Sequence, residues 1–366
     1  MSATRIIMAG GFLGAGKTTL LWEAARKLKE RSLCAGLITN DQAPELVDSA
    51  LLSREGVKVA EVSGSCFCCN FNGFIHAVES LRSEMEAADV IIAEPVGSCT
   101  DLSATILQPL KKFLRNELQV APLSVLADPV RLASILNGGT AGLHPDAAYI
   151  YRKQLEESDI ILITKTDLLS PEELAVLKKR TAKAYPEARI IAVSALTGEG
   201  LDEWLDDVMK SNGAGLRLAD VDYDIYAHGE AVLGWLNGTV RLTAAEEDTD
   251  WDGLTYRLLA ALSERFDKAG YAVGHVKVIA ENGDRYVAGN LTGKASTLAV
   301  RGSAGKGKEI KLTINARVET GPGELNEIVR ETLDALTGDT LSAETVAWRF
   351  LMPGRPQPTH RFVEVV

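Results

Sequence analysis

Residues 4–30 read TRIIMAGGFLGAGKTTLLWEAARKLKE, and this stretch sets the fold class of the protein. A short apolar run leads into a glycine-rich loop, and an amphipathic segment follows the loop. Residues 11–18 fit the phosphate-loop pattern G-x-x-x-x-G-K-[ST]. Because the loop lies between a predicted strand and a predicted helix, its backbone N–H groups and the helix amino terminus can surround phosphate groups. The stretch therefore predicts a nucleotide-binding α/β domain.

Two side chains of this loop have defined chemical roles. Lys17 can reach the β- and γ-phosphates, and the Thr18 hydroxyl can bind Mg²⁺. The alternative is a glycine turn between packed elements, which the strand-loop-helix context disfavours. The loop residues that we expect to contact the nucleotide are Gly11, Gly14, Ala15, Gly16, Lys17, Thr18 and Thr19.

Beyond the loop, short apolar runs alternate with helical stretches up to about residue 215. The expected strands after the first are at 33–40, 89–95, 123–129, 159–165 and 188–194. Near-continuous apolar strands separated by helices are typical of a parallel sheet covered on both faces. We therefore predict a doubly wound, mostly parallel α/β domain over residues 1–215, with its ligand site at the carboxyl ends of the strands.

The pattern of expected strands and helices changes after this domain. Strands are expected at 231–244, 272–281, 285–292 and 311–319, and helices at 250–270 and 322–336. Strands grouped with two helices predict a smaller α+β domain over residues 222–340. The remaining residues, 341–366, contain the proline-rich stretch WRFLMPGRPQPTHRF and are expected to form an extended tail on the surface.

The composition is that of a globular protein with an acidic balance. The chain has 366 residues, of which 46% are hydrophobic and 24% charged, and a formal net charge of -11. This charge disfavours a nucleic-acid binder, which neutralises phosphates with a basic face, and it disfavours an anionic membrane surface. No apolar run approaches the roughly 18 to 20 residues that span a bilayer, and the amino end turns glycine-rich too early for a signal peptide. We expect a cytoplasmic protein with reduced thiols and without structural disulfides.

Polar residues follow two further strands of the predicted sheet. Lys165 and Asp167 come directly after one strand, and a carboxylate there can accept two hydrogen bonds from the N1–H and N2–H₂ edge of guanine. Adenine offers no such pair of donors. The next strand ends at Ser194, Ala195 and Leu196, which match the base-contacting loop of GTPases. Together with the phosphate loop, these motifs predict GTP, although Thr164 stands where most GTPases have asparagine.

Five motifs occur in an order typical of one family: GGFLGAGKTTL, SCFCC, IIAEPVG, TKTD and SALTGEG. On these motifs the first 215 residues or so resemble the CobW-like GTPases, relatives of the urease and hydrogenase nickel-insertion GTPases and of the methylmalonyl-CoA mutase chaperone. The resemblance implies a P-loop GTPase fold, GTP with Mg²⁺, and a CobW-type domain at the carboxyl end.

The same resemblance implies roles for residues around the phosphates. Glu94 and Gly97 match an E-x-x-G motif, and Glu94 ends a buried strand where a Mg²⁺-water shell would satisfy its carboxylate. A carboxylate that only caps a turn is the alternative. Residues 39–48 resemble the first switch, in which either Asp41 or Asp48 could serve Mg²⁺ or the attacking water; many relatives carry glutamate at the Asp41 position. The residues expected to act in GTP hydrolysis are Lys17, Thr18, Asp41, Glu94 and Gly97.

Three of the five cysteines fall within the stretch SGSCFCCN, residues 63–70, at Cys66, Cys68 and Cys69. Core packing is the usual explanation for one cysteine, but the glycine and polar residues around these three do not indicate core. A C-x-C-C cluster lets thiolates converge on a soft metal such as Zn²⁺, Co²⁺, Ni²⁺ or Cu(I), whereas redox sensing by vicinal thiols is the alternative. Further ligand candidates are Glu45, Asp41, Asp48, water and a partner protein. We expect Cys34 to be a core residue, and Cys99 and His76 to be less favoured as ligands. His275 is expected on a strand facing the domain interface.

In the CobW-like family this motif lies between the two switches and binds metal, so that nucleotide and metal can influence each other. The resemblance therefore predicts a slow GTPase that carries a transition metal, with Zn²⁺ favoured over Co²⁺ and Ni²⁺, to a client metalloenzyme. It also suggests a nucleotide-dependent homodimer. The alternative is a GTPase chaperone for a cobalamin-dependent or other cofactor enzyme, in which the cysteines carry no free metal. An ATP-using kinase of the same sheet class is disfavoured by Asp167 and the loop at Ser194.

Overall fold

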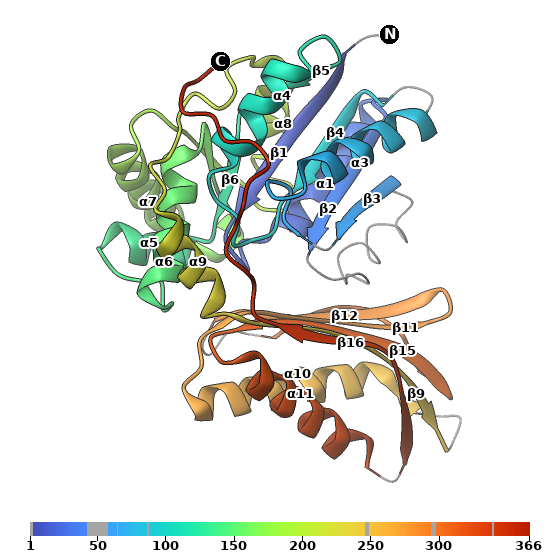
Figure 1. Ribbon diagram of the computed structural model, residues 1–366. Helices are drawn as coiled ribbons and strands as arrows, with labels where there is room; N and C mark the ends of the chain where they lie inside the picture. The colour runs from blue at the N-terminus through green and yellow to red at the C-terminus, as the bar shows by residue number, and fades with distance from the viewer. Residues whose placement is uncertain are drawn as a thin grey trace.

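Two β-sheets organise the protein, one in each half of the chain (Figure 1). The computed structural model describes residues 3–41, 58–63, 65–85, 88–245, 249–293, 298–338 and 340–366. None of the helices in these ranges is long and apolar enough to cross a membrane.

The first sheet is parallel, as predicted. Its order is β3-β2-β4-β1-β6-β7-β8, and β5 also pairs with β1. The strands are β1 (Thr4–Gly11), β2 (Ala35–Asp41), β3 (Lys58–Ser63), β4 (Val90–Glu94), β5 (Leu118–Val120), β6 (Ser124–Ala127), β7 (Ile160–Ile163) and β8 (Arg189–Ala192). The chain adds β2, β3 and β4 on one side of β1, and then β6, β7 and β8 on the other side. The carboxyl ends of β1 and its neighbours therefore form the crevice where such sheets bind ligands.

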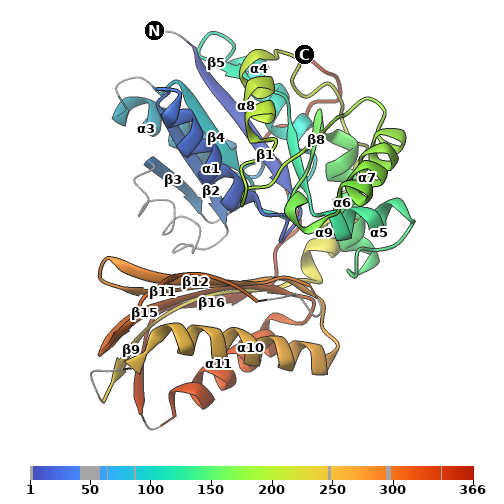
Figure 2. The ribbon, with the colours of Figure 1, turned by 180° about the vertical axis from the view of Figure 1, so that it is seen from behind.

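Helices cover both faces of this sheet (Figures 1 and 2). They are α1 (Lys17–Glu30), α3 (Phe71–Glu84), the π-helix η1 (Ser103–Leu107), α4 (Gln108–Phe113), α5 (Pro129–Leu136), α6 (Pro145–Glu157), the 3₁₀ turn η2 (Thr166–Leu168), α7 (Pro171–Ala184), α8 (Leu201–Lys210) and α9 (Tyr223–Ala231). Side chains alternate along β1: Ile7 packs with Leu21 of α1 and Trp204 of α8, whereas Ile6 and Met8 face the opposite core. Both faces of β1 are buried, which explains the continuous apolar run at residues 6–9.

The second sheet is antiparallel, in the order β13-β12-β11-β15-β9-β16. Its elements are β9 (Gly234–Ala244), β11 (Val273–Asn282), β12 (Arg285–Leu291), β13 (Ala299–Ser303), β15 (Glu309–Val318), β16 (Leu341–Leu351), and helices α10 (Trp251–Ala269) and α11 (Pro322–Thr337); β10 (Thr249–Asp250) and β14 (Lys306–Gly307) form a small pair beside it. Figure 1 shows this sheet lying between the first domain and the two helices. One face packs on α10 and α11, and the other faces the first domain. This arrangement confirms the predicted α/β domain followed by a smaller α+β domain.

The tail differs from the prediction of an extended segment over residues 341–366. Leu341–Leu351 form β16, which pairs with β9 along the edge of the second sheet. Gly238 of β9 makes room for the Trp348 ring, because a Cβ there would lie 2.4 Å from Trp348 Cε3. Only residues 352–366 are extended, and they run back along the first domain (Figure 1).

Candidate nucleotide and metal site

The phosphate loop connects β1 to α1 and is held in a conformation that requires glycine. Gly11 has φ +133°, and a Cβ at this position would lie 2.4 Å from the carbonyl oxygen of Leu126 on β6. Gly14 and Gly16 also have positive φ, of +77° and +86°. The buried Lys17 ammonium donates to the Gly11 carbonyl oxygen at 2.8 Å, so it lies folded over the loop. The loop therefore has the curvature that aims backbone N–H groups at an anion.

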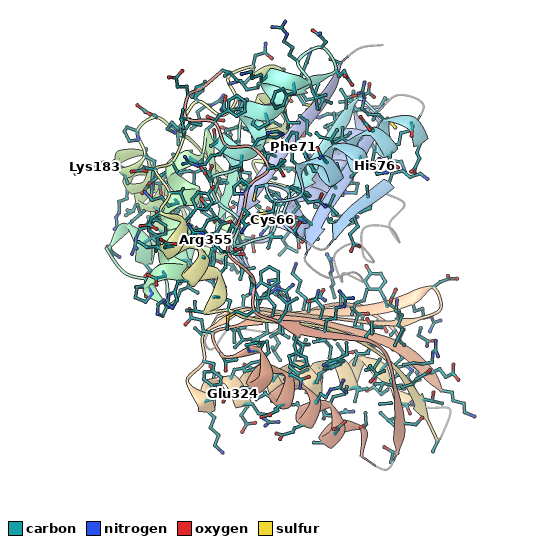
Figure 3. The ribbon with its side chains drawn as sticks, in the orientation of Figure 1. Cys66, Phe71, His76, Lys183, Glu324 and Arg355 are labelled. Carbon is teal, nitrogen blue, oxygen red and sulfur yellow. The ribbon has the colours of Figure 1, made fainter. Side chains whose placement is uncertain are left out.

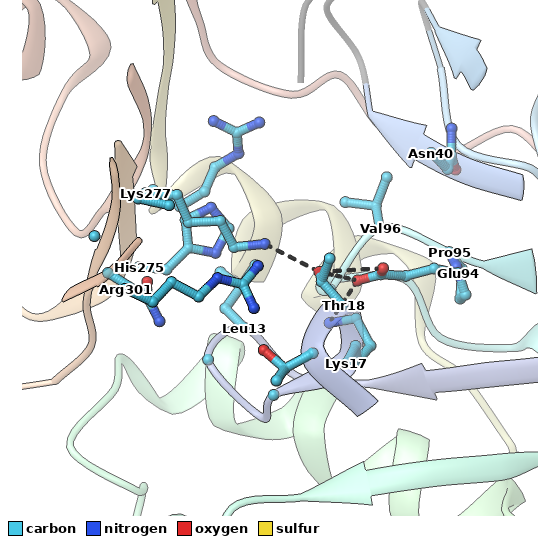
Figure 4. A pocket seen from close by; sticks show the side chains of 18 of the residues that line it. Leu13, Lys17, Thr18, Asn40, Glu94, Pro95, Val96, His275, Lys277 and Arg301 are labelled. Atoms are coloured by element: carbon cyan, nitrogen blue, oxygen red, sulfur yellow. Dashed lines mark hydrogen bonds and ion pairs between the residues drawn. The ribbon is translucent and has the colours of Figure 1, made fainter. Parts of the chain in front are cut away.

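Thr18 and Glu94 meet at the bottom of the crevice. The Thr18 hydroxyl donates toward the two carboxylate oxygens of Glu94, at 3.3 and 3.2 Å, and Lys17 Nζ lies 4.0 Å from Glu94 Oε1 (Figure 4). All three side chains are less than 10% exposed. A hydroxyl and a carboxylate are hard oxygen donors of the kind that Mg²⁺ prefers, so these residues fit the ion expected here.

Gly97 lies directly against the phosphate loop. A Cβ on Gly97 would lie 2.7 Å from Leu13 Cδ2 and 3.1 Å from Lys17 Nζ. Beyond it, Gln154 of α6 donates to the carbonyl oxygens of Gly97, at 3.0 Å, and Cys99, at 2.7 Å. The segment that follows Glu94 is thus fixed between the phosphate loop and α6.

The residues expected at the nucleobase lie together beside the phosphate loop. The Asp167 carboxylate accepts a hydrogen bond from the Ser194 hydroxyl at 2.5 Å, and the Leu196 side chain is 83% exposed. Thr164 instead supports the phosphate loop, because its hydroxyl donates to the Ala15 carbonyl oxygen at 2.8 Å. Lys165 likewise donates to Gly14 O, at 2.9 Å.

The three cysteines of the C-x-C-C motif form one cluster. Cys66 Sγ lies 3.0 Å from Cys68 Sγ, and Cys68 Sγ lies 3.8 Å from Cys69 Sγ. Cys66 and Cys68 are buried, and Cys69 is half-buried. Figure 3 labels Cys66 in the first domain. Hydrogen bonds from the other thiols hold the pKa of Cys66 well below its usual value, so the cluster favours a thiolate there. Three sulfur donors within 4.8 Å of one another suit a soft metal ion.

One expectation for the other cysteines is corrected. Cys34, expected in the core, is exposed, because it precedes β2 rather than lying inside it. Cys99 is buried and lies outside the group of three cysteines whose sulfur atoms converge, so its place as a less favoured ligand stays a prediction. His76 is exposed on α3 and is not among the donors that converge with the cysteines in the described residues. The side chain of Asp41 and all of residues 42–57, which include Glu45 and Asp48, lie outside the described structure.

Asn40 connects the nucleotide cavity to the cysteines; it falls within residues 39–48, the stretch that resembles the first switch, but the resemblance assigns it no role. We call residues 65–70 the cysteine loop. The Asn40 side chain donates to Val62 O and to Ser65 O, both at 2.8 Å, and accepts from Phe67 N–H at 2.9 Å. Asn40 also lines the cavity that Lys17 and Thr18 line (Figure 4). A single buried amide therefore touches both candidate sites.

The carboxyl-terminal tail covers the cysteine loop. Gln357 N–H donates to Cys69 Sγ at 3.1 Å, and Thr359 N–H donates to Cys68 O at 2.8 Å. The His360 ring packs edge-on against Phe71, with 5.1 Å between centroids. The tail thus contacts a thiol sulfur as well as the backbone of the loop.

A buried carboxylate lies behind the cluster. Glu230 of α9 accepts a hydrogen bond from Ser98 Oγ at 2.6 Å. Burial, and then the negative charge of Cys66, raise the pKa of Glu230 to about 8. Neither Glu230 nor Ser98 follows a sequence pattern that marks such a site.

A second group of possible donors lies between α6 and α9. His228 Nδ1 lies 2.5 Å from Asp146 Oδ2, and His144 Nδ1 accepts from Asp146 N–H at 3.2 Å. These contacts cap α6 and join it to α9, which accounts for the three side chains without a metal.

The fold and this geometry define a phosphate-loop nucleotide-binding protein with a thiol cluster linked to its nucleotide cavity. The family model described as "CobW/HypB/UreG, nucleotide-binding domain" matches residues 5–192, just over half of the sequence. The chain therefore belongs to the CobW/HypB/UreG family.

Several named proteins share this region. The zinc-regulated GTPase metalloprotein activator 1 of Schizosaccharomyces pombe is 25% identical over 202 residues, covering 54% of this chain and 47% of its own. The hydrogenase maturation factor HypB of Escherichia coli K12 is 28% identical over 195 residues, covering 53% and 58%. The zinc chaperone CobW of Pseudomonas aeruginosa is 24% identical over 222 residues, covering 53% and 57%. The chain thus spans about half the length of these relatives.

Solved structures that match part or most of the chain include HypB from Helicobacter pylori in complex with nickel, at a TM-score of 0.41 and 20% identity, covering 57% of this chain and 86% of that chain. Zn(II)-bound YjiA GTPase from Escherichia coli has a TM-score of 0.35 and 14% identity, covering 92% of this chain and 99% of that chain.

Proposed function

We propose that this protein is a GTP-binding, slowly GTP-hydrolysing metallochaperone that couples its nucleotide state to the binding and delivery of a transition metal. The observation that carries the proposal is the position of Asn40, whose amide lines the nucleotide cavity and holds the cysteine loop through three hydrogen bonds. If a bound nucleotide displaced Asn40, these hydrogen bonds would move the loop that carries the thiols.

In this proposal, GTP lies on the phosphate loop with its base against Asp167 and the loop at Ser194. Lys17 and the loop amides bind the phosphates, and Thr18 and Glu94 would hold Mg²⁺. The ion, when bound, neutralises charge on the β- and γ-phosphates. The chain's own residues position the nucleotide, and the contact between Gly97 and the phosphate loop lets the following segment respond to the γ-phosphate. Asp41, the last residue of β2, and Asp48 are the two candidates for serving Mg²⁺ or orienting the attacking water.

The cargo is a soft divalent metal held by Cys66, Cys68 and Cys69. Zn²⁺ is the favoured ion, with Co²⁺ and Ni²⁺ as the alternatives; the names of the relatives, which include zinc chaperones and a nickel-bound HypB structure, support this choice. The lowered pKa of Cys66 supports metal ligation, since the thiolate is the binding form. A client metalloenzyme would receive the ion.

A metal competition titration tests the proposal. Zn²⁺, Co²⁺ and Ni²⁺ are titrated against a chromogenic chelator with a non-hydrolysable GTP analogue, with GDP and without nucleotide. We expect tight binding that changes with the nucleotide in the wild type and is lost in the Cys66/Cys68/Cys69→Ser variant. Because such coupling is reciprocal, metal must change GTP affinity by the same factor.

Asn40→Ala separates coupling from binding. This variant is expected to retain metal and nucleotide binding while the effect of the nucleotide on metal affinity shrinks. Metal affinity that is equal in all nucleotide states of the wild type would refute a nucleotide-gated carrier and favour the alternative, a chaperone for a cofactor-dependent enzyme.

A further inference from the structure

The second domain contributes basic side chains to the nucleotide cavity. Side chains alternate along β11, so that Val276 and Val278 enter the core with α10 and α11, whereas His275 and Lys277 point to the first domain. The cavity has a volume of about 360 Å³. Its lining from this sheet includes His275, Lys277, Asn290, Arg301 and Arg317.

Backbone contacts fix β11 against the phosphate loop. The half-buried guanidinium of Arg131 donates to Leu13 O at 3.0 Å and to Val273 O at 3.1 Å, bridging the loop and the first residue of β11. Gly274 packs on Leu13, since a Cβ there would lie 2.8 Å from Leu13 Cδ1. The side chains that follow on β11 are therefore held at a set distance from the phosphate loop.

Lys277 reaches the centre of the phosphate site. Its ammonium donates to Thr18 Oγ1 at 3.4 Å, and the same hydroxyl lies 3.2 Å from Glu94 Oε2 (Figure 4). The ammonium thus lies beside the oxygen donors that the proposed function assigns to Mg²⁺. An ion held by Thr18 and Glu94 would therefore lie next to the Lys277 ammonium.

The charge of the cavity points to a polyanionic ligand. Among its described lining residues, four are cationic, namely Lys17, Lys277, Arg301 and Arg317, and one, Glu94, is a carboxylate. Burial and the neighbouring cations, Lys277 first, hold the pKa of His275 well below its usual value, so the imidazole is neutral. An excess of cations in a partly enclosed cavity is costly without an anion, and a triphosphate supplies one.

We propose that the β11 face of the second domain is the second half of the phosphate site, and that Lys277 binds the terminal phosphate of a nucleoside triphosphate. This inference rests on the proposed function and extends it to the second domain. In the structure, the Lys277 ammonium lies on Thr18. With Mg²⁺ and a triphosphate, the ammonium moves from Thr18 to the γ-phosphate oxygens, and the second domain thereby distinguishes triphosphate from diphosphate.

Calorimetric titrations of a non-hydrolysable GTP analogue and of GDP, both with Mg²⁺, test the inference on the wild type and Lys277→Met. The variant is expected to bind the analogue at least about ten-fold more weakly, as for loss of one hydrogen bond to a charged group, and GDP less than about three-fold more weakly. Lys277→Arg should recover most of the difference. Lys311→Met is the matched control, because Lys311 lies on the same sheet in an ion pair with Glu281 and is not part of the cavity lining.

The outcomes separate the two proposals. If the wild type binds neither nucleotide, the proposed function fails. If the wild type binds both and Lys277→Met weakens both equally, or neither, Lys277 does not read the terminal phosphate and the inference is overturned while the function stands. Thermal unfolding of each variant shows whether the substitution prevents folding. If Lys277→Met does not fold, the ratio of the affinities for the GTP analogue and for GDP is measured on Lys277→Arg instead.

Discussion

Replacing the buried carboxylate of Glu157 with an amide is expected to change how the stability of the protein depends on pH. Glu157 ends α6 and is fully buried. Its carboxylate accepts hydrogen bonds from Thr100 Oγ1, at 3.0 Å, and from Ser103 N–H, at 2.9 Å, and so holds the segment that follows Gly97. Burial, and then the charge of Asp101, raise the pKa of Glu157 from 4.5 to about 8.

The sign of the effect follows from proton binding. Between pH 4.5 and 8 the unfolded chain has released this proton, whereas the folded protein keeps it. Because the folded state then binds more protons, stability is fully retained below pH 4.5 and falls as the pH rises toward 8. At about 1.4 kcal/mol for each pH unit, this group lowers the free energy of unfolding by roughly 2 to 3 kcal/mol between pH 5 and pH 7.

Urea unfolding at several pH values between 5 and 8 measures this effect. The stability of Glu157→Gln relative to the wild type should increase by roughly 2 to 3 kcal/mol from pH 5 to pH 7, because the amide does not titrate. Glu156→Gln is the matched control, since this neighbouring carboxylate is exposed and binds Lys153. A difference between Glu157→Gln and the wild type that stays constant over this pH range would contradict the assignment of a raised pKa to Glu157.

Three further predictions concern the tail, the phosphate loop and the remaining exposed thiol. Arg361→Met leaves the buried Asp101 carboxylate without the cation that lies 2.7 Å from it, so thermal unfolding should occur at a lower temperature and the cysteine loop should react faster with a thiol reagent. Gly11→Ala places a methyl group 2.4 Å from Leu126 O at a φ of +133°. Calorimetry of this variant should detect no nucleotide binding, and its free energy of unfolding should be lower by about 3 kcal/mol. Cys34→Ser, which changes an exposed thiol outside the cluster, should leave the metal stoichiometry unchanged in the chelator titration.

The first sheet was predictable because its signals are local. A buried parallel strand needs an unbroken apolar run, and a phosphate loop needs glycines at fixed spacing, so a few consecutive residues carry each signal. The pairing of β16 with β9 was missed for the opposite reason. The stretch that forms β16 is largely exposed and mixes polar with apolar residues, and only its partner strand makes it β-structure.

The candidate site likewise has parts that local sequence predicts and parts that only the folded chain reveals. Short sequence patterns, together with the family resemblance, predict the roles of the phosphate loop, Glu94, the nucleobase motifs and the three cysteines, because neighbouring residues carry the chemistry of each. Two contacts emerge only from the folded chain: Asn40 holds the cysteine loop, and Lys277 meets Thr18 across 259 positions of the chain. The first joins β2 to the loop that follows β3 within the first domain, and the second depends on how the two sheets pack against each other. Packing of this kind leaves no periodic trace in either of the two segments that it brings together.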